Sequence, residues 1–100
     1  MAFRALVGHL ERLRGLLFTS CDAEPVALLA CSSIHTFGMA YPIDVAFVGG
    51  DGTVLVAQRA VGPGLLLGNR RATMTLERPQ DTTPWLTAGE RVVIKREGGA

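Results

Sequence analysis

The chain has 100 residues, 48% of them hydrophobic, and its ten Lys and Arg residues against nine Asp and Glu residues leave a net charge of +1 at pH 7. A chain of this length and hydrophobicity fits one domain, residues 1–100, with one core. A charge so close to zero creates no field that would concentrate nucleic acid at the surface, so we expect no nucleic-acid partner.

The amino-terminal residues do not form a signal-peptide core, because Gly8 and His9 interrupt the apolar run and charged residues follow at once. No stretch reaches the roughly 18 to 20 apolar residues that a membrane helix requires. We therefore expect a cytoplasmic protein without a membrane span. In a reducing cytoplasm Cys21 and Cys31 are expected to be free thiols, although a loop that folds back between them would allow a disulfide.

The first predicted element is an amphipathic helix near residues 6–18. Its leucines recur at three- and four-residue spacing, whereas Glu11, Arg12 and Arg14 fall largely on the opposite face. Such an apolar stripe needs a sheet or another helix to cover it. The apolar run 25–31, entered through a proline, is short enough to favour a buried strand.

Two β-prone runs, 43–48 and 53–58, predict a hairpin, because the glycines between them can adopt positive φ. A phosphate-binding role for these glycines lacks both the Lys-Ser/Thr of a P-loop and the spacing of a dinucleotide fingerprint. Residues 62–71 are interpreted as a loop that contains three consecutive leucines. The remaining predicted elements are strands at 72–76 and 91–95, with a short helical turn at 84–86.

These elements together predict an α+β fold. We expect the amino-terminal helix to pack on a curled, largely antiparallel β-sheet that is partly closed, like a barrel. Neither an internal repeat nor a domain linker interrupts the pattern.

The segment 31–47 contains most of the reactive side chains. Cys31, His35 and Asp44 would form a hydrolase site if folding brought the thiol, the imidazole and the carboxylate together. On an extended strand, residues four apart stand about 13 Å apart along the chain, so only a turn or a helix would join Cys31 to His35. The structural alternatives are a Cys31 at the end of a buried strand and an Asp44 that caps backbone amides after Pro42.

A metal site is a further alternative, because Cys31, His35 and Met39 follow the ligand order of the blue-copper proteins. Such a site needs a second histidine, and the other histidine, His9, lies in the predicted helix. Zinc is not favoured either, since paired Cys-x2-Cys spacing is absent. We therefore expect no cofactor and interpret Met39 and Phe37 as core or pocket-wall residues.

The favoured interpretation is a non-enzymatic binding or accessory domain, for an unknown small molecule or protein, with a cleft around residues 34–41 beside the 62–71 loop. Polar and aromatic side chains next to apolar loop residues are typical of recognition surfaces. Arg70 and Arg71 could together bind an anion, and exposed loop leucines would suggest a partner surface or a dimer, so we expect a monomer or a weak dimer. The expected ligand-binding residues are His35, Thr36, Phe37, Met39, Tyr41, Arg70 and Arg71.

A longer pattern runs through the same segment. It reads Cys31-x-x-Ile34-His35-Thr36-x-Gly38-Met39-x-x-Pro42-Ile43-Asp44-Val45-x-Phe47, with Glu11-Arg12-x-Arg14-Gly15-Leu16-Leu17 upstream and Arg71-Ala72-x3-Leu76-Glu77 downstream. The pattern resembles the family called domain of unknown function 192 over about residues 6–95. This resemblance implies a small α+β domain with a curled, largely antiparallel sheet, and it implies no established activity. Many members of that family have tryptophan at the position of His35, which argues against an obligatory imidazole ligand or base.

Overall fold

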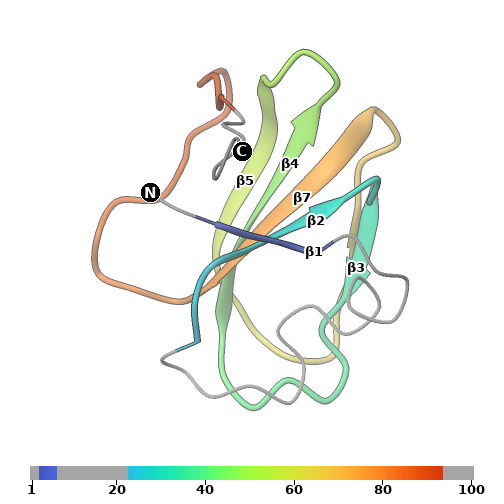
Figure 1. Cartoon of the computed structure of the whole chain (residues 1–100). Coiled ribbons are helices and arrows are strands. Elements are labelled where there is room, and N and C mark those ends of the chain that lie inside the picture. The colour runs from blue at the N-terminus through green and yellow to red at the C-terminus, as the bar shows by residue number, and fades with distance from the viewer. Residues whose placement is uncertain (1–2, 7–22, 94–100) are drawn as a thin grey trace, which may run out of the picture.

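The structure, a computed structural model of the chain, describes residues 3–6 and 23–93. These residues form two β-sheets (Figure 1), one with five strands and one with two. The larger sheet has the order β1 (Arg4–Leu6), β2 (Val26–Leu29), β7 (Ala72–Pro79), β4 (Ile43–Gly49) and β5 (Val54–Val61). The smaller sheet pairs β3 (Ser33–His35) with β6 (Leu66–Gly68).

The strands β4 and β7 form the centre of the larger sheet, and every residue of β4 is buried. Because successive side chains of a strand point to opposite faces, β4 supplies both faces of the sheet. Val45 and Phe47 join one hydrophobic cluster, with Leu28 of β2, whereas Ala46 and Val48 join another. The buried apolar side chains of the described residues therefore lie in two clusters, rather than in the one core expected from composition.

The predicted hairpin is confirmed, since β4 and β5 pair in antiparallel register. The turn is closed by a hydrogen bond from the Gly49 N–H to the Thr53 carbonyl, at 2.9 Å. Gly52 in this turn has φ +87°, and a Cβ there would lie 2.7 Å from the Val92 carbonyl oxygen. Both the backbone conformation and the close approach of residue 92 therefore require glycine.

The strands predicted at 25–31 and 72–76 are confirmed as β2 and β7, and β7 continues to Pro79. The strand predicted at 91–95 is wrong in its described part, because Arg91 makes a single antiparallel bridge with Thr53. The helical turn predicted at 84–86 is also wrong, since these residues have no regular structure. The indole N–H of Trp85 donates to the Val45 carbonyl at 3.0 Å, so a tertiary contact holds this segment in place of a local helical bond.

The predicted α+β class is wrong, because the described residues contain strands and no helix. The predicted curled, barrel-like sheet is wrong as well. Closure would require the outer strands β1 and β5 to pair, but residues 89–92 cover the start of β5 instead. The sheet is mixed, since β1 runs parallel to β2, whereas its other strand pairs are antiparallel.

The predicted amphipathic helix at 6–18 lies outside the described residues, apart from Leu6, which ends β1 with a buried side chain. His9 and Cys21 lie outside them too. A search of the described residues for a helix long and apolar enough to cross a membrane finds none.

Candidate functional site

The segment around His35 pairs with part of the leucine-containing loop. The register of β3 with β6 is antiparallel and joins Ile34 to Leu67 and His35 to Leu66. Part of the region interpreted as a loop, 62–71, is therefore a strand. Ile34 and Leu67 pack against a buried cluster, and because paired side chains lie on the same face, His35 and Leu66 lie on the other, outer face. The β3–β6 ribbon is thus anchored through one face and exposed through the other.

Thr36 fixes this ribbon to the turn that precedes β6. Its N–H donates to the Leu65 carbonyl at 2.8 Å, its hydroxyl donates to the Gly62 carbonyl at 2.8 Å, and its hydroxyl oxygen accepts from the Leu65 N–H at 2.8 Å. Thr36 is fully buried, with 0% exposure. A buried hydroxyl with donor and acceptor both satisfied makes a rigid connection. Thr36 therefore positions the surface from beneath and is not accessible to a ligand.

The outer face of the ribbon carries exposed apolar and aromatic side chains. The rings of His35 and Phe37 stack, with centroids 5.5 Å apart and an interplanar angle of 25°. Phe37 is 56% exposed and Leu66 77%. Of the five large exposed hydrophobic side chains in the described residues, Phe37 and Leu66 lie here, and a third, Leu65, directly precedes β6. We call His35, Phe37, Leu65 and Leu66 the β3–β6 patch. Neighbouring exposed apolar side chains of this kind mark interaction surfaces.

The other predicted ligand-binding residues are placed differently. Met39 and Tyr41 are half-buried and pack against a buried cluster. Arg70 and Arg71 are exposed and follow β6 after Asn69, in a turn where the Arg71 N–H donates to Asn69 Oδ1 at 3.0 Å. The two arginines therefore lie beyond the end of the ribbon strand, whereas Met39 and Tyr41 support the surface from within.

An open hollow of about 280 Å³ lies beside the β4–β5 turn. It is lined by Gly49, Gly50, Asp51, Thr53, Leu55 and Arg71. Of the predicted ligand-binding residues, Arg71 alone contributes to this lining. The hollow is thus distinct from the expected cleft around residues 34–41.

The candidate catalytic residues have three separate sets of partners. The Cys31 thiol donates to the Ser33 carbonyl at 3.1 Å, whereas His35 is exposed and stacks on Phe37. The extended strand β3 separates the thiol from the imidazole. Within the part of the chain that the structure describes, no group of three or more His, Cys, Asp and Glu side chains is placed to hold a metal ion.

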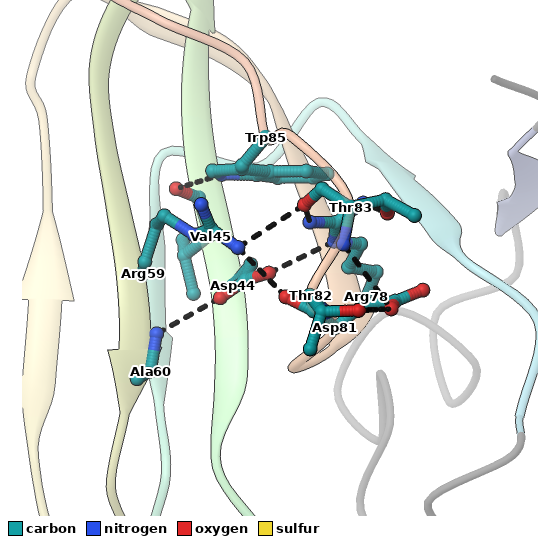
Figure 2. Close-up of polar contacts among 9 residues, drawn as sticks. All are labelled: Asp44, Val45, Arg59, Ala60, Arg78, Asp81, Thr82, Thr83 and Trp85. Carbon is teal, nitrogen blue, oxygen red and sulfur yellow. Dashed lines mark hydrogen bonds and ion pairs between the residues drawn. The ribbon is translucent and has the colours of Figure 1, made fainter.

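Asp44 is the third candidate and is fully buried in a polar network (Figure 2). Its Oδ2 accepts from Arg78 Nε at 2.8 Å, and its Oδ1 accepts from the Ala60 N–H at 2.8 Å. Ala60 has φ +53°, a conformation that costs energy for a residue with a side chain. Asp44 therefore neutralises a buried guanidinium and holds the irregularity of β5 at Ala60, which is the structural role expected of a carboxylate that binds backbone amides.

Arg78 is the residue that sequence reasoning missed. Its guanidinium donates to Thr83 Oγ1 at 3.0 Å and to the Thr83 carbonyl at 2.6 Å, and it lies 4.8 Å from the centre of the Trp85 ring. Figure 2 shows these side chains converging between β4 and the segment that follows β7. An arginine within an otherwise buried strand was the available signal, but its partner is 34 residues away. The network binds the segment 81–85 to the sheet.

At the edge of this network, Asp81 is exposed. Its Oδ1 accepts from the backbone N–H groups of Thr82 and Thr83, at 2.6 and 3.3 Å. The hydrogen bond from the Thr83 backbone, followed by that from Thr82, lowers the pKa of Asp81 below its usual value of 3.8.

No protein-family model matches this chain, and no curated protein matches it. Among solved structures, the chain is similar to the crystal structure of a protein of unknown function from Novosphingobium aromaticivorans, with a TM-score of 0.64 and 22% identity. The likeness covers 78% of this chain and 64% of that one, so the chain spans less than two thirds of the other protein's length. At this identity the likeness shows the fold alone. The membership of the family domain of unknown function 192 stays a prediction.

Proposed function

We propose that this chain is a non-enzymatic binding domain that recognises another protein through the β3–β6 patch. The observation that carries the proposal is the exposure of the stacked His35–Phe37 pair beside Leu65 and Leu66. Aromatic residues are enriched at protein interfaces, and a few well-placed ones dominate binding energy. The membership of the family domain of unknown function 192, a cytoplasmic location and a monomeric or weakly dimeric state belong to the same proposal.

A protein partner suits this surface better than a small molecule. Small-molecule sites are concave and enclose most of the ligand, whereas a Leu66 side chain that is 77% exposed stands clear of its surroundings. The anchoring of the ribbon also favours the binding of a partner. Because Thr36 and the inner residues hold the ribbon in place, its outer side chains are ordered before a partner arrives, which lowers the entropy cost of binding.

The test is site-specific photo-crosslinking in the cells that produce the protein. With a photoreactive amino acid at position 37, we expect a discrete crosslinked protein, and Leu66→Ser should lower its yield about tenfold, since hot-spot truncations cost more than about 1.4 kcal/mol. Val93→Ser is the matched control, because Val93 is apolar, 78% exposed and outside the patch. It should leave the yield unchanged.

Two results would contradict the proposal. One is a crosslinked product whose yield responds equally to Leu66→Ser and Val93→Ser. The other is the absence of a discrete product with the photoreactive group at positions 37 and 65. Both serine variants should retain the stability of the original chain within about 0.5 kcal/mol, because both positions are exposed.

A further inference from the structure

The hydrogen-bond pattern of the β3–β6 ribbon fixes the direction of each backbone group. The Thr36 N–H donates to the Leu65 carbonyl at 2.8 Å, and the Asn69 N–H donates to the Ser32 carbonyl at 2.9 Å. In an antiparallel pair, hydrogen-bonded and non-hydrogen-bonded positions alternate. Counting inward from both ends, the pairs His35–Leu66 and Ser33–Gly68 are non-hydrogen-bonded. Their N–H and C=O groups point away from the partner strand.

Leu66 and Gly68 consequently present their backbone donors and acceptors along the outer edge of β6. Outside the β-ladders, the backbone hydrogen bonds of the described residues involve neither of them. Both residues are exposed. An open strand edge next to exposed apolar side chains is a template for a further strand.

Of two other strand edges in the described part of the chain, that of β5 is covered and that of β3 is occupied at one acceptor. The Val54 N–H of β5 donates to the Glu90 carbonyl, and the Val54 carbonyl accepts from the Gly89 N–H, each at 2.8 Å. The pairing of β5 with β4 is also irregular at two places, and bulges of this kind discourage edge pairing. On the outer edge of β3, the Ser33 carbonyl already accepts from the Cys31 thiol. The edge of β6 differs from both.

We propose that β6 binds an extended segment of another protein as an added strand, an inference that rests on the proposed binding function and names its mode. The residue of that segment opposite Leu66 would place its side chain on the outer face of the ribbon, so an apolar residue suits this position. Arg70 and Arg71 follow β6, are exposed and form no ion pair within the described residues. An acidic residue near them gives charge complementarity. The partner is therefore an extended apolar segment with an acidic end.

The experiment uses the full chain and a phage-displayed library of nine-residue peptides as the probe. Selected peptides are synthesised and titrated into the ¹⁵N-labelled protein. We expect them to alternate apolar and polar residues and to carry an acidic end. When they bind, the amide hydrogens of Leu66 and Gly68 should exchange with solvent at least about tenfold more slowly, since they gain hydrogen bonds.

Two variants at one position separate the backbone from the side chain. Leu66→Ala shortens the side chain and keeps the backbone N–H, whereas Leu66→Pro also removes the N–H, because proline has none. The fold does not use this N–H, and proline is tolerated on the free edge of a sheet. Leu66→Pro should bind the peptide about tenfold more weakly than Leu66→Ala. The ¹H–¹⁵N spectrum shows whether each variant is folded. If Leu66→Pro does not fold, the exchange rates in the wild-type complex decide the question.

The outcomes distinguish this inference from the function on which it rests. If peptides perturb Phe37 and His35 but leave the exchange of Leu66 and Gly68 unchanged, strand addition is overturned and recognition through the patch stands. If no library peptide binds, strand addition is overturned as well, and the crosslinking experiment alone decides the binding function. Slower exchange together with the deficit of Leu66→Pro supports the inference.

Discussion

The burial of Asp44 makes it depend on a single charged partner. Asp44 is fully buried and Arg78 is 4% exposed, with 2.8 Å between Oδ2 and Nε. A buried ion pair adds little compared with an apolar pair of the same volume, but the loss of one partner leaves an uncompensated charge in the interior. Replacing one member of the pair should therefore lower the stability of the fold more than replacing both.

Arg78→Met should therefore lower the free energy of unfolding by about 3 to 5 kcal/mol, measured by urea denaturation. The double variant Asp44→Asn/Arg78→Met should be more stable than Arg78→Met alone, because it removes the unpaired carboxylate. Arg91→Met is the control, since it breaks an exposed pair with Asp51 at 3.6 Å and should change stability by at most about 1 kcal/mol. Equal losses for the two single variants would contradict the role of the buried pair.

The lowered pKa of Asp81 gives the molecule an acid-sensitive contact. The N–H groups of Thr83 and Thr82 favour the charged carboxylate, so the pKa is lower in the folded than in the unfolded chain. The contribution to stability is complete at pH values above the unfolded pKa and is lost as pH falls through the folded one. A carboxyl-carbon NMR titration of Asp81 should give a midpoint below 3.8, and Asp81→Asn should reduce the loss of stability on acidification. A midpoint at or above 3.8 would contradict the lowered pKa of Asp81.

At the scale of the elements, the strands that could be predicted are those with a recognisable pattern in their own residues. The β4–β5 hairpin follows from two β-prone runs around glycines, and β2 follows from a short apolar run. The strands β3 and β6 have three residues each, and their pairing joins positions about thirty residues apart, so no local pattern reveals it. His35 and Phe37, which are exposed, were among the predicted binding residues, because polar and aromatic side chains beside apolar loop residues are typical of recognition surfaces. The contacts of Thr36 and Arg78 depend on distant residues and could not be predicted.

Thr36→Val tests the connection between ribbon and turn. Valine keeps nearly the same shape but leaves the Leu65 N–H and the Gly62 carbonyl without their side-chain partner, which should cost about 1 to 3 kcal/mol of stability. The amide hydrogen of Leu65 should then exchange faster with solvent. Thr36→Ser retains the hydroxyl and should preserve the protection of Leu65. Identical exchange of this amide in the two variants would show that the hydroxyl does not hold the ribbon.

At the scale of the whole molecule, the sheet is covered on both faces by irregular or short segments. The ribbon residues Ile34 and Leu67 pack on one cluster, and Trp85 and Val92 of the carboxyl-side segment pack on the other. An apolar central strand such as β4 requires cover on both faces, and the α+β prediction assigned part of this cover to the helix expected at 6–18, which lies outside the described residues apart from Leu6. In the described residues that cover comes from strand and loop. The similarity to the Novosphingobium aromaticivorans protein extends over most of this chain.

The position of Trp85 has one more consequence. It is the only tryptophan in the chain, and its ring lies beside the Arg78 guanidinium in the cluster opposite the one that anchors the ribbon. The fluorescence of this tryptophan therefore reports on one side of the sheet, and the ribbon is anchored on the other. The molecule carries a built-in optical reporter of its folding that is separate from the surface proposed for its partner.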